Sequence, residues 1–337
     1  MAYNQPKVAI LILNWNGKKD TLECLESLTL LKYKNYQTAV IDNGSNDDSV
    51  EAIMKQYPQT TVLQTNANLG YAGGNNVGIS WAIDNNFDYI FLLNNDTIVD
   101  PYLINSLITS EQKQHNKSIL GAKIYFYDKP NTLWFAGGRW LKQFNRFEHI
   151  GYGSTDNINF NNLNEVDYIT GCALFASAAT FKDVGLLDEQ FFLTYEETDW
   201  CYRARKKGYK CFVVPDAKLW HKVSSSFGGA ESPLVIYFMT RNKLLWGKKH
   251  LTYQAILKLH KDNYHILRNI FLPPITLYNP ELPLIKGLLW SLSTWLKTIK
   301  LNISKPANIA TLIAIRDYYF SRFGDCPEKI RQLNIKK

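Results

Sequence analysis

The chain has 337 residues, of which 46% are hydrophobic and 14% aromatic, so it is long enough for one large domain or two ordinary ones and too apolar to be disordered. Its five cysteines show no CxxC spacing and no secretory signal opens the chain, which argues against a disulfide framework or a zinc site and favours a reducing cytoplasm. The net charge of +8 is unevenly divided: residues 1–200 carry 14 Lys and Arg against 23 Asp and Glu, whereas residues 201–337 carry 24 against 7.

The first hundred residues alternate between strands and helices. Apolar runs predict strands at residues 7–15, 38–41, 61–64 and 89–93. Helical spacing of apolar residues predicts the helices between them, at 18–31, at 49–57, and from a Gly/Asn-rich loop to about residue 85. This alternation predicts an α/β fold with a mainly parallel sheet that helices cover on both faces.

The pattern becomes less regular after Asp100. We expect a helix at 102–113 and short strands at 119–127, 132–135 and 168–176. The stretch 151–164 is rich in Asn and short polar residues, which is typical of a mobile surface loop.

From Ser232 the sequence becomes helical and basic, with interleaved Trp, Leu and Tyr that favour a membrane surface over nucleic acid. Apolar residues fall on one face of a predicted helix at 284–299, while Lys286, Lys297 and Lys300 lie elsewhere. No run reaches the roughly 20 apolar residues that span a bilayer. This helix either packs against the remainder of the protein or lies in the membrane interface.

Four polar loops follow the four predicted strands and should meet at the carboxyl edge of the sheet, where open α/β folds bind ligands. They carry Asn14 and Asn16, Asp42, the Gly/Asn-rich stretch 66–76, and Asp96. In the third loop, Gly70, Gly73 and Gly74 would let backbone approach a ligand, and the amides of Asn75 and Asn76 suit phosphate or ribose oxygens. The loop is neither a GxGxxG fingerprint nor a P-loop.

The run FLLNNDTIVD ends a buried strand in Asn94, Asn95 and Asp96, which predicts a metal and phosphate site. An ordinary Asn/Asp turn would give the same pattern. Asp42 directly follows its strand and suits a pyrimidine N–H or a ribose hydroxyl, although a turn aspartate that bonds its own backbone is the alternative.

Two downstream motifs carry further candidate groups. Glu196, Glu197 and Asp199 lie among aromatic residues, which can raise carboxyl pKa values toward those of a general base; alternatively, they cap a helix, with Arg203 paired to Asp199 at i+4. His221 follows a short apolar stretch and precedes a Ser/Gly loop that we expect to be mobile, and it is a candidate ligand for a divalent ion.

The ordered motifs ILNWNG, DNGSND, NLGYAGGNN, LLNNDT, TGCALF, FFLTYEETDWCYR and HKVSSSFGG resemble family 2 glycosyltransferases of the GT-A fold. The resemblance is strongest to the bacterial rhamnosyltransferase-like branch that builds cell-surface polysaccharides, and it covers about residues 7–250. It implies a GT-A type, Rossmann-like sheet at residues 1–250, followed by a basic, acceptor- or membrane-facing helical region at 251–337. It also implies inverting sugar transfer from a nucleotide diphosphate, assisted by Mg²⁺ or Mn²⁺.

The resemblance also assigns roles to residues. Asp96 matches the metal-holding acid of the family's DXD motif, with Asn94 at its first position, so that His221 is expected to assist. Asp42 matches the acid that reads the base, and Asn14, Trp15 and Asn16 match the loop around the nucleotide; Asn66, Gly70, Asn75, Asn76 and Asn95 belong to the donor motifs. Glu197 matches the proposed general base, for which Glu196 is the alternative. Asp199 and Trp200 fall where the family positions acceptor and base, and Arg203 would brace that helix.

The expected partners are a dTDP- or UDP-sugar, with dTDP-rhamnose as the first guess, and a saccharide acceptor that is lipid-linked or a growing polysaccharide. We expect the protein to lie at the inner face of the plasma membrane without crossing it. Two other functions remain open, a sugar nucleotidyltransferase and a non-catalytic nucleotide-sugar-binding module. A nucleotidyltransferase would require more glycines than the segment NWNGKK contains. A binding module gains support from Asn94 and from Glu at the base position.

Overall fold

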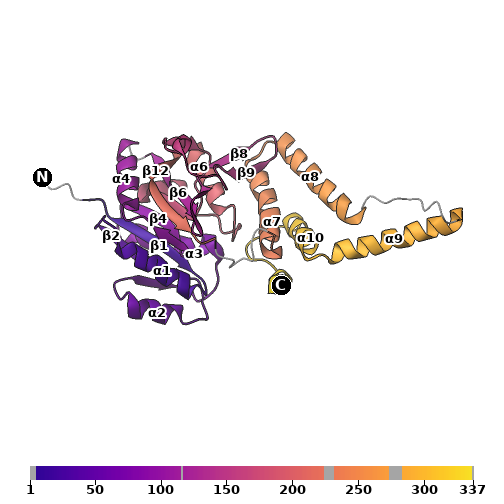
Figure 1. Cartoon of the computed structure of the whole chain (residues 1–337), viewed down its shortest axis with the longest axis horizontal. Helices are drawn as coiled ribbons and strands as arrows, with labels where there is room; N and C mark the ends of the chain where they lie inside the picture. The colour runs from indigo at the N-terminus through magenta and orange to yellow at the C-terminus, as the bar shows by residue number, and fades with distance from the viewer. Residues whose placement is uncertain (1–4, 115–116, 224–230, 273–282, 336–337) are drawn as a thin grey trace. The chain divides into compact units, whose positions relative to one another are not determined.

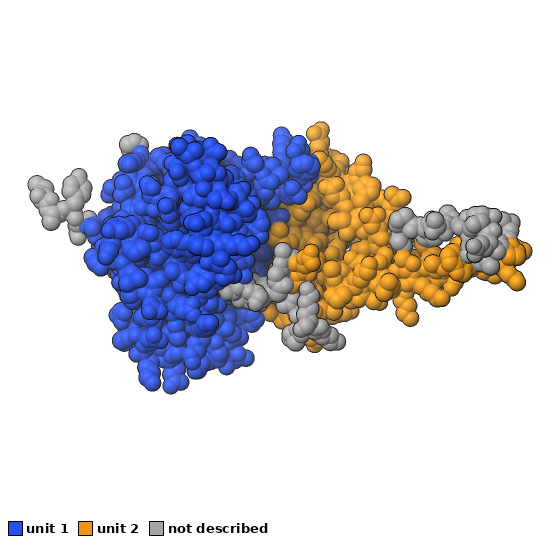
Figure 2. Space-filling model, in the orientation of Figure 1, with its two compact units in different colours: residues 1–224 blue, residues 225–337 orange. Residues whose placement is uncertain are grey.

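The computed structural model describes residues 5–114, 117–223, 231–272 and 283–335. The chain forms two compact units, residues 1–224 and 225–337, coloured separately in Figure 2. The expected division at residue 250 differs from this one, because α7 (Pro233–His250) packs on α10 (Pro306–Tyr319) and α11 (Glu328–Ile335) of the second unit. The Tyr237 hydroxyl on α7 donates a hydrogen bond to Asp317 on α10, at 2.9 Å.

The first half of unit 1 is the predicted strand and helix alternation, shown in Figure 1. Its elements are β1 (Val8–Asn14), α1 (Lys18–Thr29), β2 (Tyr36–Asp42), α2 (Ser49–Gln56), β3 (Thr61–Gln64), α3 (Gly70–Asp84), β4 (Tyr89–Asn94), β5 (Thr97–Val99) and α4 (Leu103–Lys113). Strands β4, β1, β2 and β3 are neighbours in this order and run parallel. Their side chains are mostly buried apolar residues, as expected for strands that are covered on both faces.

The second half of unit 1 completes the sheet. Its elements are β6 (Ser118–Phe126), β7 (Lys129–Phe135), β8 (Gly138–Leu141), β9 (Arg146–His149), η1 (Ile158–Phe160), β10 (Asn164–Val166), β11 (Ala173–Ser177), α5 (Ala178–Val184), α6 (Glu196–Lys206) and β12 (Lys210–His221). The sheet order is β10-β12-β6-β11-β4-β1-β2-β3, and β8 and β9 form a separate hairpin. Because β11 is antiparallel to both β4 and β6, the sheet is mixed, with a parallel majority.

The stretch 151–164, expected to be a mobile loop, is hydrogen-bonded to β6 at its centre. The fully buried Lys123 ammonium lies 3.0 Å from Asp156 Oδ1 and donates to Asn161 Oδ1 at 2.9 Å. The Tyr125 hydroxyl donates to Asp156 Oδ2 at 2.6 Å. Burial opposes ionisation of Asp156, but these hydrogen bonds outweigh it and lower the pKa of the carboxyl.

We expect Asp156→Ala to lower the free energy of unfolding by about 2–4 kcal/mol, because it leaves the Lys123 ammonium buried without its carboxylate. Urea unfolding followed by circular dichroism measures this loss. The matched control is Asp128→Ala on the exposed turn after β6, which should change stability by less than about 0.5 kcal/mol. Equal stability of the two variants would contradict the structural role of the Lys123 pair.

Unit 2 is helical and consists of α7, α8 (Tyr253–Phe271), α9 (Leu284–Ser304), α10 and α11 in its described residues. Leu244 of α7, Leu259 of α8 and Ile315 and Tyr318 of α10 form its buried apolar cluster. None of the helices in the described part of the chain combines the length and the apolar character needed to cross a membrane.

Candidate active site

Polar residues end the parallel strands at one edge of the sheet, as the sequence predicts. Asn14 at the end of β1 is in register with Asp42 at the end of β2, and its neighbour Leu13 is in register with Asn94 at the end of β4. Asn66 follows β3, exposed and with a left-handed φ of 60°. The strand register therefore brings three of the four predicted loops directly together.

Asn14 holds the Asp42 carboxylate by a hydrogen bond. Asn14 is completely buried, and its amide nitrogen donates to Asp42 Oδ1 and to Ser49 Oγ, both at 2.9 Å. Its amide oxygen accepts hydrogen bonds from the Thr21 hydroxyl and the Gly17 backbone N–H. We expected Asn14 to contact the nucleotide, but its polar atoms are engaged within the protein, so that its role is to orient the Asp42 carboxylate.

Trp15 and Asn16 form the exposed rim of this corner. The Trp15 ring is 39% exposed. Asn16 has a left-handed φ of 52°, and its side-chain oxygen accepts a hydrogen bond from the Asn46 backbone N–H at 2.8 Å. Trp15 directly follows Asn14, which is in register with the buried Asp42. An exposed aromatic ring and a buried carboxylate are suitable groups for a nucleobase, whose face stacks and whose N–H donates.

The Asn14 network continues to the loop after β4. Asn95 donates to the Thr21 hydroxyl at 3.0 Å, and Thr21 in turn donates to Asn14. The side-chain nitrogen of Asn95 would lie 2.4 Å from a Cβ added at Gly17, so only glycine fits there without a shift. Asp42 and the Asn94–Asp96 segment are thus fixed relative to each other by a short chain of buried hydrogen bonds.

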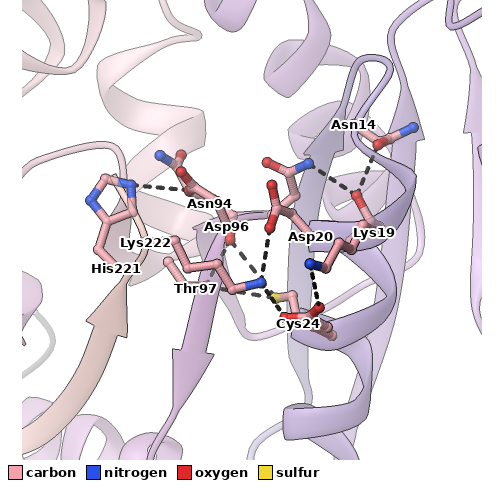
Figure 3. Close-up of polar contacts among 12 residues, drawn as sticks. Asn14, Lys19, Asp20, Cys24, Asn94, Asp96, Thr97, His221 and Lys222 are labelled. Carbon is pink, nitrogen blue, oxygen red and sulfur yellow. Dashed lines mark hydrogen bonds and ion pairs between the residues drawn. The ribbon is translucent and has the colours of Figure 1, made fainter. Parts of the chain in front are cut away.

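Asp96 and His221 lie side by side, as predicted for two ligands of one cation. The short strand β5, which the sequence analysis did not predict, pairs antiparallel with the end of β12 and places Thr97 opposite His221. The distance from Asp96 Oδ1 to His221 Nε2 is 3.0 Å, and both residues are buried (Figure 3). Burial disfavours the imidazolium, but Cys172 and the Asp96 carboxylate together raise the pKa of His221 to about 10.

The donor set at Asp96 and His221 fits a divalent cation that also binds a diphosphate. Among the described residues no group of three or more His, Cys, Asp and Glu side chains could hold a metal ion by itself. One carboxylate and one imidazole nevertheless suffice for Mg²⁺ or Mn²⁺ when phosphate oxygens and water complete the coordination. A cation would replace the proton that His221 shares with Asp96. Asn94, at the first position of the motif, is half-buried.

Glu196 and Glu197 begin α6 after a strained loop. Phe192, Thr194 and Tyr195 all have left-handed φ values, of 64°, 66° and 74°. A left-handed φ is energetically costly for residues other than glycine, and here three occur within four positions. Backbone strain of this kind clusters at functional sites. The loop turns the chain so that the two glutamates enter the helix at its N-terminus.

The pKa values of both glutamates are raised, for partly different reasons. Burial raises the pKa of Glu196 well above its ordinary value, and the neighbouring Glu197 carboxylate raises it further. Burial also raises the pKa of Glu197, to about 7, but the backbone N–H groups of Glu197, Thr198 and Gly171 favour its charged form. Burial thus favours the neutral form of both carboxyls, and the pKa of Glu197, about 7, suits a general base near neutral pH.

Arg203 braces α6 against the segment before it, as expected. Its guanidinium bonds Asp199 Oδ2 at 2.7 Å, the i+4 pair predicted from the sequence, and also the carbonyls of Val184 and Leu186. Trp200 is completely buried, stacks on Phe181 and donates to the Gly185 carbonyl. We expected Asp199 and Trp200 beside the acceptor, but Trp200 has no exposed surface and both residues serve to hold the helix.

The Gly/Asn-rich loop before α3 does not have the expected arrangement. The N-terminal backbone N–H groups of α3, at Tyr71 and Ala72, donate to the Phe192 carbonyl instead of facing an open phosphate site. A Cβ at Gly70 would lie 2.4 Å from that carbonyl, and one at Gly74 would lie 2.4 Å from Leu13. The glycines therefore allow close packing of α3 on the Phe192 loop and the sheet.

Asn75 and Asn76 are also engaged within the protein. Asn75 donates to the Tyr71 carbonyl at 2.9 Å. The Asn76 amide exchanges hydrogen bonds with the backbone of Leu187 and donates to Glu189 Oε1 at 3.0 Å. We expected both to bind phosphate or ribose; instead, they are buried, and Asn76 fixes the segment that leads to the two glutamates.

The turn before β11 connects the cation pair to the glutamates. The Cys172 carbonyl accepts a hydrogen bond from the Asn94 backbone N–H at 3.0 Å. The N–H of the preceding residue, Gly171, favours the charged form of Glu197. TGCALF is one of the motifs of the family resemblance, but its residues carried no predicted role. Asn94 lies more than 70 residues before this turn, and nothing in the local sequence indicates that the turn contacts both Asn94 and Glu197.

Comparison with known proteins agrees with this geometry. The mixed sheet with a polar carboxyl edge defines a GT-A type fold, which is shared with the crystal structure of GalNAc-T7 with UDP, GalNAc and Mn²⁺ (TM-score 0.58, 14% identity, 89% of this chain and 58% of that chain). Residues 9–180 match glycosyl transferase family 2, so the chain belongs to this family.

Three curated relatives are each 25% identical to this chain. The low-salt glycan biosynthesis hexosyltransferase Agl10 of Haloferax volcanii aligns over 71% of this chain and 74% of its own length. The dTDP-rhamnosyl transferase RfbF of Shigella flexneri aligns over 71% and 79%. The N-acetylglucosaminyl-diphospho-decaprenol L-rhamnosyltransferase of Mycobacterium tuberculosis aligns over 60% and 72%. The resemblance inferred from the ordered motifs is thereby confirmed.

Proposed function

We propose that the protein transfers a sugar, L-rhamnose as the first candidate, from a nucleotide diphosphate donor to a saccharide acceptor, in one displacement that inverts the anomeric carbon. The observation that carries the proposal is the pairing of Asp96 with His221 at the edge of the sheet that also presents Asp42. Unit 1 thus contains a candidate residue for reading the base, a candidate pair for holding a cation at the diphosphate, and a carboxyl with a pKa of about 7. The names of two relatives support rhamnose and a lipid diphosphate acceptor.

In this mechanism Asp42 accepts a hydrogen bond from the nucleobase or ribose, and Trp15 covers the base. Asp96 and His221 would hold Mg²⁺ or Mn²⁺, which when bound neutralises charge that develops on the departing diphosphate. Glu197 accepts the proton of the acceptor hydroxyl at its carboxylate as that hydroxyl attacks the face of the sugar opposite the diphosphate. Burial and the Glu197 carboxylate favour the protonated form of Glu196, which adds no negative charge beside the base.

The donor is tested by release of nucleoside diphosphate from a panel of dTDP-rhamnose, UDP-glucose, UDP-N-acetylglucosamine and GDP-mannose, each with a polyprenyl-diphosphate-linked saccharide acceptor. Parallel reactions contain Mg²⁺, Mn²⁺ or a chelator. We expect acceptor-dependent release with dTDP-rhamnose in the presence of a divalent cation. Release with a different donor would replace rhamnose, and absence of release with every donor would contradict sugar transfer.

We expect kcat to rise with pH through a midpoint near 7. The pKa of Glu197 is raised to about 7, and only the deprotonated carboxylate can accept the acceptor proton, so activity is lost below the midpoint and present above it. Steady-state rates between about pH 5.5 and 9 in a buffer series of constant ionic strength measure the profile. Rates that fall as pH rises through 7 would contradict Glu197 as the base.

We further propose that unit 2 binds the surface of an anionic membrane through α9. The side chains of Ile285, Leu288, Leu289, Leu292 and Leu296 share one helical face and are between 52% and 73% exposed. Lys286, Lys297 and Lys300 are exposed elsewhere on the helix. Exposure of this face supports the interfacial interpretation over packing within the protein, because lysines can reach lipid headgroups while the apolar face enters the acyl boundary.

Sedimentation with phosphatidylglycerol-containing vesicles tests this second proposal. We expect the full chain to sediment with these vesicles, and the double variant Leu288→Glu/Leu292→Glu to lose at least about tenfold in partitioning, since a charge in the acyl boundary is costly. The control Ser293→Glu changes charge on the exposed polar side of the same helix and should retain most binding. Failure of the unmodified chain to bind would contradict the proposal.

A further inference from the structure

Tyr71, at the start of α3, contacts both of the segments that surround Glu197. Its backbone N–H donates to the carbonyl of Phe192 in the strained loop before α6, at 2.6 Å. Its hydroxyl donates to the carbonyl of Gly171 in the turn before β11, also at 2.6 Å. The Gly171 N–H favours the charged form of Glu197. Tyr71 therefore holds both the loop that leads into the helix of Glu197 and the turn that contacts its carboxyl.

The contacts of Tyr71 are too close to tolerate an intervening group. A Cβ added at Gly171 would lie 2.5 Å from the Tyr71 hydroxyl oxygen, and one added at Gly70 would lie 2.4 Å from the Phe192 carbonyl oxygen. Gly70 also has a φ of +72°, which side chains rarely adopt. Burial raises the pKa of the Tyr71 hydroxyl well above its ordinary value, and the nearby Glu196 and Glu197 carboxyls raise it further, so that Tyr71 remains a hydrogen-bond donor.

We propose that Tyr71 is a positioning residue for the general base: its hydroxyl fixes Gly171 so that the Gly171 N–H stays directed at the Glu197 carboxylate. The inference rests on the proposed role of Glu197. Without the hydroxyl, the Gly171 carbonyl loses a partner, the turn relaxes and its N–H bonds the carboxylate less well. A weaker bond to the charged form favours the protonated form, so less of the enzyme carries a base at neutral pH.

Other titratable groups near Glu197 do not account for a shift of its midpoint in a Tyr71 variant. On α6 itself these are Glu196, whose pKa burial raises well above its ordinary value, and Asp199, which is paired with Arg203. Tyr168, on the segment between β10 and β11, and Tyr195, in the strained loop, also face Glu197, and burial raises the pKa of each hydroxyl further above neutrality. The titration of Glu197, the carboxyl that the Gly171 N–H contacts, is therefore the direct readout of the loss of the Tyr71 hydroxyl.

The test is Tyr71→Phe, with Tyr36→Phe as the matched control. The Tyr36 hydroxyl likewise donates to a backbone carbonyl, that of Leu28, at 2.8 Å, but it lies at the start of β2, at the other end of the strand from Asp42. Two measurements are made: kcat across the pH range, and the carboxyl titration of Glu197 by ¹³C NMR of glutamate-labelled protein, assigned by its absence in Glu197→Gln.

For Tyr71→Phe we expect the Glu197 midpoint to rise by about 0.5–1 pH unit in both measurements. At pH 7 kcat should fall by about three- to tenfold and recover by pH 9, with the donor KM changed less than about twofold. A second variant, Gly171→Ala, crowds the hydroxyl and should move the midpoint in the same direction. Tyr36→Phe should leave the midpoint unchanged.

A rate loss in Tyr71→Phe that is equal at all pH values, with an unshifted carboxyl titration, would show a merely structural role and overturn the inference. An unshifted titration in a fully active variant would overturn it as well. The NMR titration does not depend on turnover. A shifted titration in a protein that transfers no sugar would therefore support the positioning role of Tyr71 and contradict the proposed function instead.

Discussion

Glu197→Gln should reduce kcat by about 10²–10⁴-fold, because the amide matches the shape of the carboxyl but cannot accept a proton from the acceptor hydroxyl. The substitution also removes the charge that raises the pKa of Glu196, so no loss of folding stability is expected. Nucleoside diphosphate release under saturating donor and acceptor measures kcat, and a thermal melt verifies the fold.

Glu196→Gln is the matched control for this experiment. Glu196 is buried, and its pKa is raised well above its ordinary value, which favours the neutral form, so a neutral amide should reproduce much of its environment and reduce kcat by less than about tenfold. If Glu196→Gln instead showed the larger loss, the base would be Glu196, the alternative that the sequence left open. Equal, small effects of both substitutions would contradict a carboxylate base on α6.

Sequence patterns predicted the framework of unit 1 well, because its strands are buried on both faces and read as uninterrupted apolar runs. β1, β2 and β4 end within two residues of the predicted positions, and their ends bring Asn14, Asp42 and Asn94 to one edge. The pairing of Asp96 with His221 was also predicted, although through family resemblance. The strand β5 that creates it has only three residues and pairs with a strand more than 100 residues later.

Sequence reasoning failed where a residue type suits both a ligand and the protein's own backbone. Asn76 and Gly70 have the composition of a phosphate loop, yet Asn76 bonds Leu187 and Gly70 packs against Phe192. The partners lie more than 100 residues away in the sequence and give no local signal. Lys123 shows the same difficulty, because nothing in the sequence near it indicates that the partly buried Asp156 will pair with its buried ammonium.

Asp96→Asn should lower kcat/KM by about 100-fold or more at a fixed, subsaturating concentration of Mn²⁺. The amide retains an oxygen but loses the charge that a divalent cation requires, and the His221 imidazole alone is a weak site for Mg²⁺ or Mn²⁺. The midpoint of Mn²⁺ activation should therefore move to higher concentration. Mn²⁺ binding in the presence of nucleoside diphosphate, measured by electron paramagnetic resonance, gives a readout that does not depend on turnover.

The matched control is Asp100→Asn, four residues later in the same segment. The Asp100 side chain accepts a hydrogen bond from the Tyr102 backbone N–H at 2.8 Å, which an asparagine oxygen can replace. It should leave the Mn²⁺ midpoint unchanged. His221→Gln should weaken Mn²⁺ binding less than Asp96→Asn, because the imidazole contributes no charge to the bound state. If Asp96→Asn turned over normally in the presence of a chelator, Asp96 would be a turn residue and the transfer would not depend on a cation held there.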